Sequence, residues 1–171
     1  MTLDDLLPYF DSVSETEYEK LNELYEIFLR DFKDEYFYLN DCKVVIKNYQ
    51  SKSRGFTQYC ETFVHIITRK SELKGKRILD SERANRIHWI RPILENKSDS
   101  RIKYFQYTEA DGAIRDYYWF REKDFMVIVE KITMNYLLIT GFVLDQDQVR
   151  RYDRRLNHYN YSLNTKKPHL R

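Results

Sequence analysis

The chain has 171 residues, of which 42% are apolar, 33% charged and 16% aromatic, and it contains only four glycines and three prolines. This size and composition predict one folded domain spanning residues 1–171 and exclude disordered and fibrous proteins, and scarce glycine excludes a glycine-rich nucleotide-binding loop. The net charge is only +2, but residues 1–41 carry a net charge of −9 while residues 69–103 and 150–171 carry +6 each, so two separate basic segments are available to a polyanion.

The acidic segment 1–41 contains the clearest helix signal. Ser14 to Glu17 has the spacing of a capping box, and apolar residues then recur at helical spacing up to about residue 34, namely Leu21, Leu24, Tyr25, Phe28 and Phe32. The run at 43–49 predicts a strand. Residues 56–68 are β-branched and aromatic, and this composition fits either a strand or a helix.

A second helix is predicted over residues 81–95, with Asp80 or Ser81 as its N-cap. Four residues of this helix form one apolar stripe: Ala84, Ile87, Ile90 and Leu94. After residue 96 the apolar pattern alternates with period two and predicts strands at 102–108, 114–121, 125–132 and 136–144, joined by short polar turns. A charged helix at about 147–158 leads into a polar tail.

The predicted fold class is therefore α+β, with N-terminal helices packed against a four-stranded antiparallel meander sheet and a short C-terminal helix. Within the single domain we distinguish an acidic helical part at 1–41, a core at 42–158 and a basic polar tail at 159–171. No signal-peptide pattern opens the chain, and no apolar run reaches the roughly 18 residues of a spanning helix. We expect a cytoplasmic protein with reduced thiols and no membrane partner.

Metal and cysteine chemistry have little support in the sequence. The four histidines lack the spacing of a zinc-binding helix, and the aspartates at 145 and 147 are better explained as a solvated pair at a strand end. Cys42 and Cys60 do not have metal-site spacing, and Cys60 has no cationic neighbour that would activate it. We therefore expect no metal site, no nucleotide cofactor and no other cofactor.

The segment between residues 69 and 91 favours RNA, because it is rich in arginine and lysine and precedes an aromatic hairpin. Guanidinium groups bind phosphates, and aromatic rings stack on unpaired bases. For the aromatic residues the alternative is core packing, since one face of each strand must be buried. The predicted RNA contacts are Arg77, Arg91, Tyr118, Trp119, Arg150, Arg151, Arg154 and Arg155.

Four further residues are candidates for catalysis, each with a structural alternative. His65 lies in an apolar stretch, where it acts either as a general acid or base or as a hydrogen-bonded core histidine. Arg83 falls inside the apolar stripe, so it must be paired or project into a wet cleft. Arg86 flanks the stripe, and Thr140 interrupts an apolar run with a hydroxyl that either touches substrate or bonds to a neighbour.

Taken together, these residues resemble a known pattern. His65, Arg77, the run from Glu82 to Leu94, the strand at 117–119 and the strand at 138–142 are similar to the phage- and plasmid-borne branch of the barnase, EndoU, colicin and RelE-like ribonucleases. The resemblance covers about residues 56–158. It implies a helical part against a four-stranded antiparallel sheet and metal-independent RNA cleavage on the sheet surface.

Carried over by position, the resemblance matches His65 to the family's histidine, Arg83 and Arg86 to its arginine pair, and Thr140 to the hydroxyl of a late strand. Gly141 departs from the pattern, since alanine is common at that place.

Two functions are consistent with these observations. The first is a metal-independent endoribonuclease of toxin or phage-effector type, in which the 2′-OH of RNA attacks the adjacent phosphate, with an antitoxin or immunity protein as a candidate second partner. The alternative is a noncatalytic module that binds RNA or a protein through the same basic face. A His65 side chain in a cleft beside the arginines favours catalysis, and one sealed in the core favours binding.

Overall fold

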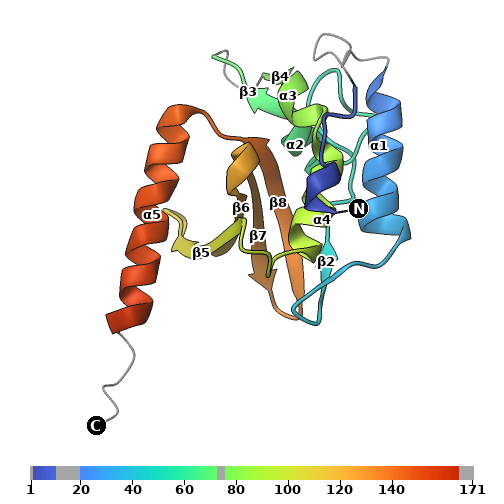
Figure 1. Cartoon of the computed structure of the whole chain (residues 1–171). Coiled ribbons are helices and arrows are strands. Elements are labelled where there is room, and N and C mark those ends of the chain that lie inside the picture. Colours follow the sequence, from blue (N-terminus) through green and yellow to red (C-terminus); the bar gives the residue numbers. More distant parts are fainter. Residues whose placement is uncertain (1, 11–19, 73–75, 166–171) are drawn as a thin grey trace.

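A six-stranded mixed sheet forms the centre of the computed structural model, which describes residues 2–10, 20–72 and 76–165 (Figure 1). In the order β1-β2-β8-β7-β6-β5, its strands are β1 (Tyr38–Leu39), β2 (Cys42–Val45), β8 (Asn135–Val143), β7 (Phe125–Ile132), β6 (Ile114–Phe120) and β5 (Ile102–Thr108). A separate two-stranded hairpin consists of β3 (Thr68–Lys70) and β4 (Arg77–Leu79).

The predicted four-stranded antiparallel sheet is wrong, because two further strands extend it beyond β8. Strands β5 to β8 run antiparallel in sequence order, but β2 pairs in parallel with β8, and β1 pairs antiparallel with β2. Asn40 and Asp41 both have positive φ, at 48° and 60°, which is the geometry of a tight two-residue hairpin turn. The β2–β8 pairing joins residues about 90 positions apart, and such pairing leaves no local pattern in the sequence.

The predicted short C-terminal helix is also wrong. Helix α5 (Gln146–Thr165) has 20 residues and includes 159–165, which the sequence had indicated as tail. Its side chains at helical spacing, Tyr152 and Leu156, are buried against the sheet. Tyr159 continues this stripe and packs edge-on against Tyr104 of β5, with ring centroids 5.8 Å apart. The apolar stripe therefore extends the helix past residue 158.

The N-terminal helix and the ambiguous segment both form helices. Helix α1 (Leu21–Leu29) continues into a π-helical turn, η4 (Arg30–Asp34), and its apolar residues are buried as predicted, with Tyr25 only partly so. The predicted capping box at 14–17 lies outside the described residues. Residues 61–67 form α2 (Glu61–Ile67), whose hydrophobic residues are all buried. Tertiary burial thus decides between helix and strand where composition could not.

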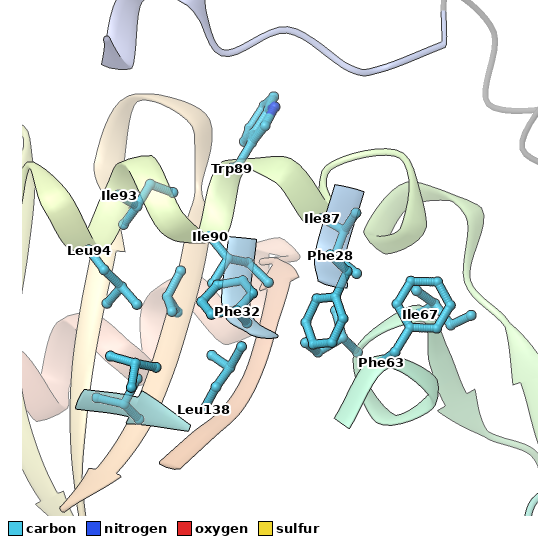
Figure 2. Close-up of a cluster of buried hydrophobic side chains, with 14 of the residues drawn as sticks. Phe28, Phe32, Phe63, Ile67, Ile87, Trp89, Ile90, Ile93, Leu94 and Leu138 are labelled. Atoms are coloured by element: carbon cyan, nitrogen blue, oxygen red, sulfur yellow. The ribbon is translucent and has the colours of Figure 1, made fainter. Parts of the chain in front are cut away.

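The single helix predicted at 81–95 is divided into α3 (Ser81–Ala84), a 3-10 turn η5 (Ile87–Trp89) and α4 (Ile90–Glu95). Of the two predicted N-caps, Asp80 is the one that caps α3, since its side chain accepts a hydrogen bond from the Arg83 amide. Pro92 has no amide hydrogen and fits best in the first turn of a helix, which explains why α4 restarts just before it. The predicted stripe is nevertheless fully buried, and Figure 2 shows Ile87, Ile90 and Leu94 pointing into the core.

The two faces of the sheet carry separate apolar clusters. Helices α1, α2 and α4 contribute to the larger cluster, which includes Phe28, Phe63, Ile90 and Leu138 (Figure 2). Helix α5 lies on the other side of the sheet (Figure 1) and covers the smaller cluster, which includes Phe142. Because α5 packs mainly on β5, it leaves the β8 end of this face less covered. Within the described ranges no helix has the length and apolar character needed to cross a membrane.

Candidate active site

A pocket of about 420 Å³ lies where α2 packs beside β8. Lys47, Glu61 and His65 line one side of it, and Arg115 and Glu130 line the side formed by β6 and β7. On β8 the half-buried side chains of Leu137 and Ile139 provide an apolar wall, whereas the Leu138 side chain is buried in the larger cluster. The pocket therefore combines titratable groups of both charges with an apolar surface, a composition typical of ligand sites.

The short helix α2 explains why His65 faces the pocket. Glu61 and His65 are four residues apart and therefore lie on one face of the helix, while the side chains between and after them are buried. The Lys47 amide donates a hydrogen bond of 2.8 Å to the Thr62 hydroxyl, which holds Lys47 against the first turn of α2. His65 is half-buried, so it is neither sealed in the core nor free in solvent.

The surroundings of His65 keep its imidazole neutral. Burial, together with the positive charges of Arg77, Arg83 and Lys47, lowers the pKa of His65 to about 4, against the opposing effect of Glu61. An imidazole with this pKa carries no charge at pH 7, and its unprotonated nitrogen can accept a proton. His65 therefore has the protonation state of a general base.

Arg77 is anchored to the end of α2. Its Nε donates to the Thr68 hydroxyl at 2.6 Å, and its Nη2 donates to the backbone carbonyls of His65 and Thr68 at 3.2 and 3.1 Å. These bonds satisfy carbonyls that a helix C-terminus leaves without partners. Arg77 thus holds the end of the helix that carries His65 and brings positive charge to it.

The sequence left open whether Arg83 is paired or projects into a wet cleft, and in the structure it forms an ion pair with Asp80. Its Nε lies 3.2 Å from a carboxylate oxygen of Asp80, and its guanidinium carbon lies 5.1 Å from the centre of the Phe142 ring. Within the described residues, Asp80 is the only acceptor that contacts the guanidinium. Burial lowers the pKa of Arg83, and the charges of Arg77 and Arg69 lower it further. A bound anion would offset the repulsion between these neighbouring positive charges.

Arg86 and Arg91, by contrast, are engaged elsewhere. Arg86 pairs with Glu82 and packs over the Trp89 ring at 5.4 Å. Arg91 forms ion pairs of 2.8 Å with Glu35 and with Glu95. Neither arginine lines the pocket that His65 lines, and Arg77 and Arg83 do not line it either; those two act on His65 through their charge.

Three other candidate site residues are covered by neighbouring side chains: Tyr118, Trp119 and Thr140. Tyr118 is 3% exposed and belongs to the larger cluster, while Trp119 is fully buried in the smaller one. Their rings present no open face to a base in this structure, which agrees with the packing alternative. Thr140 is 8% exposed, lies on β8 opposite Ile128, and is not among the residues that line the pocket.

Of the four α5 arginines, three are exposed: Arg150, Arg151 and Arg154. Arg155 instead stacks on Tyr107, with its guanidinium carbon 3.5 Å from the ring centre, and so fastens α5 to the sheet. The start of α5 approaches Arg83 through Phe142, whose ring centroid lies 6.4 Å from that of Tyr152. The basic segments 69–103 and 150–171 therefore approach each other on the same side of β8.

Sequence reasoning missed Lys47, Glu61, Arg115 and Glu130. The four-residue spacing of Glu61 and His65 would have indicated a shared face if the segment had been assigned to a helix. Arg115 and Glu130 are directly opposite each other on β6 and β7, and opposite charges at that position of a hairpin are a known cross-strand pattern. Lys47 had no such signal, because only tertiary packing places it beside α2.

Comparison with protein-family models, with curated proteins and with solved structures finds no match for this chain. Within the described part of the chain, no group of three His, Cys, Asp or Glu side chains is arranged to hold a metal ion. The pocket and the cations around it are therefore the features that bear on function.

Proposed function

We propose that this protein is a metal-independent endoribonuclease that uses His65 as its general base. The observation that carries the proposal is a half-buried, neutral imidazole in a pocket that Lys47 also lines, with the charges of Arg77 and Arg83 close enough to lower its pKa. RNA supplies its own nucleophile, the 2′-OH, and needs from the protein a proton acceptor and positive charge near the phosphate. These two requirements are met by side chains of this chain.

In the proposed reaction, the 2′-oxygen forms a bond to the adjacent phosphorus while His65 accepts the hydroxyl proton. The bond from phosphorus to the 5′-oxygen breaks, and the imidazolium returns the proton to that oxygen. The products are a 2′,3′-cyclic phosphate and a 5′-hydroxyl. Arg83 and Lys47 stabilise the negative charge that develops on the phosphate oxygens, because preorganised cations act most strongly in a partly dehydrated site.

Binding of the phosphodiester also prepares His65 for the second step. The neighbouring cations lower the pKa of His65, and an anion bound between them offsets their charge. The imidazolium formed after proton transfer is then more stable than it would be in the empty pocket.

The test is cleavage of a single-stranded RNA oligonucleotide with EDTA present throughout. Wild-type protein should produce the cyclic phosphate, and His65→Ala and His65→Asn should lower the rate by roughly 10²–10⁴-fold, the usual contribution of a general base. His158→Ala is the matched control, because His158 is exposed on α5. Thermal unfolding of each variant verifies that it is folded.

Two outcomes contradict the proposal. The first is a loss of cleavage on chelation, and the second is an unchanged rate in both folded His65 variants. RNA binding without cleavage by the wild type indicates the noncatalytic module instead. In a bacterial host, expression of the wild type should slow growth and expression of His65→Ala should not, as expected of a toxin-type ribonuclease.

A further inference from the structure

A cysteine and a lysine from distant parts of the chain meet on the sheet, outside the pocket that His65 lines. Cys42 is the first residue of β2, and Lys131 lies near the end of β7. Strand β8 separates these two strands, and its Tyr136 pairs with Lys131 on one side and with Val44 on the other. The contact between Cys42 and Lys131 therefore crosses β8 and joins residues 89 positions apart.

The two side chains are closer together than a hydrogen bond requires. The Lys131 Nζ lies 2.5 Å from the Cys42 Sγ, whereas hydrogen bonds from nitrogen to oxygen span about 2.7–3.2 Å, and sulfur is a larger atom than oxygen. A single atom bonded to both nitrogen and sulfur spans a gap of this length. The ammonium also lies over the Tyr136 ring, 4.8 Å from its centre, and this cation–π contact helps to hold the lysine at the thiol.

Both groups are accessible to a small oxidant. Lys131 is exposed and Cys42 is half-buried, so dissolved dioxygen reaches the pair without any opening of the core. The second cysteine of the sequence, Cys60, is 3% exposed and belongs to the larger cluster. The chain therefore offers an accessible cysteine in contact with a lysine and a buried cysteine that serves as an internal comparison.

We propose that oxidation links Cys42 to Lys131 through one bridging oxygen atom, in a covalent N–O–S bond. With dioxygen as the oxidant, Cys–SH, Lys–NH2 and O2 give Cys–S–O–NH–Lys and H2O. The S–H bond and one N–H bond break, and an S–O bond and an N–O bond form. Sulfur and nitrogen each lose two electrons and dioxygen gains all four, so that one of its oxygen atoms enters the bridge and the other leaves as water.

The bridge is reversible and fastens β2 to the sheet. Its sulfur has the oxidation level of a sulfenic acid, which thiols reduce. Strand β2 is held to β8 by the pairing of Val44 with Tyr136 and of Val45 with Leu137, and the bridge adds a covalent tie to β7. A crosslink that closes a long loop restricts the unfolded chain more than the folded chain. Oxidation should therefore stabilise the fold, whether or not the protein cleaves RNA.

The first experiment measures the mass of the full chain after incubation in oxygen-saturated buffer and after anaerobic incubation with dithiothreitol. The oxygen-treated chain should be about 14 Da heavier, because it gains one oxygen atom and loses two hydrogen atoms, and dithiothreitol should reverse the change. Proteolysis should yield a linked pair of peptides that contain Cys42 and Lys131. An unchanged mass, a disulfide between two copies, or a Cys42 sulfinic acid without the link overturns the proposal.

The second experiment repeats the treatment with variants of the two residues. Lys131→Arg keeps the positive charge at an exposed position but has no primary amine, and Cys42→Ser has no thiol, so neither should give the linked product. Lys123→Arg is the matched control, because Lys123 is also exposed and has no part in the bridge, and it should give the product as the wild type does. Formation of the same product by Lys131→Arg overturns the assignment.

The third experiment measures thermal unfolding of each protein before and after oxidation. The midpoint of the wild type should rise by roughly 5 °C or more, as expected for a crosslink that closes a loop of this length, and dithiothreitol should return it to the starting value. The midpoint of Lys131→Arg should stay the same in both conditions. Comparing each protein with itself removes any effect of the substitution on folding. A linked wild-type chain with an unchanged midpoint overturns the inference that the bridge fastens β2.

Discussion

His65 is the proton acceptor of the proposed reaction, and its protonation also links folding to pH. The pKa of His65 is about 4 in the folded protein and near 6.5 for an unperturbed histidine. Between these two values the unfolded chain binds more protons than the folded chain. The stabilising contribution of neutral His65 is therefore complete above about pH 6.5 and is lost as the pH falls toward 4.

We expect the free energy of unfolding to fall between pH 7 and pH 4, with about 3 kcal/mol of the loss due to His65. His65→Gln should show a correspondingly smaller decrease when urea unfolding is measured across this range. Burial also lowers the pKa of His88, so the difference between the two proteins isolates the part due to His65. Parallel curves for wild type and His65→Gln would mean that folding does not lower the pKa of His65.

At the scale of elements, α4 holds the helical layer on the sheet. Leu94 is fully buried at the end of the apolar stripe, and α4 packs against β6 and β7. Leu94→Ala should lower the free energy of unfolding by about 2–5 kcal/mol, because it leaves a cavity in a packed core. Ser98→Ala, at an exposed position nearby, should change it by less than about 0.5 kcal/mol. A loss that small for Leu94→Ala would place the stripe in solvent.

Charge distribution is a property of the whole molecule, and it distinguishes arginines that can bind RNA from those that hold the fold. Arg69 is exposed near Arg83, whereas Arg91 is neutralised by Glu35 and Glu95. Phosphate binding releases counterions, so RNA affinity should fall with salt at a slope of about −0.7 for each phosphate contact.

Arg69→Ala should therefore make the salt slope shallower by about 0.7, and Arg91→Ala should leave it unchanged. The measurement is RNA affinity across a series of salt concentrations in a His65→Ala background, which prevents cleavage. An affinity that does not depend on salt would argue against phosphate contacts and favour a protein partner for this face.

The sequence by itself determined the elements whose signals are local. The period-two pattern predicted strands at 102–108 and 125–132 with the bounds that β5 and β7 have in the structure. The 3.6-residue pattern identified the buried stripe from Ala84 to Leu94. The helical stripe also singled out Arg83, and the apolar run at 63–67 singled out His65, because a polar group within an apolar pattern must be satisfied or functional.

Only the tertiary structure decided the features that depend on distant residues. Parallel pairing of β2 with β8 extends the sheet to six strands, and packing beside β8 makes α2 a helix that turns His65 into a pocket. The same packing brings Arg115 and Glu130 to that pocket and buries Tyr118 and Trp119. A sequence pattern shows which face of an element is apolar, but which elements cover that face depends on contacts between residues far apart in the chain.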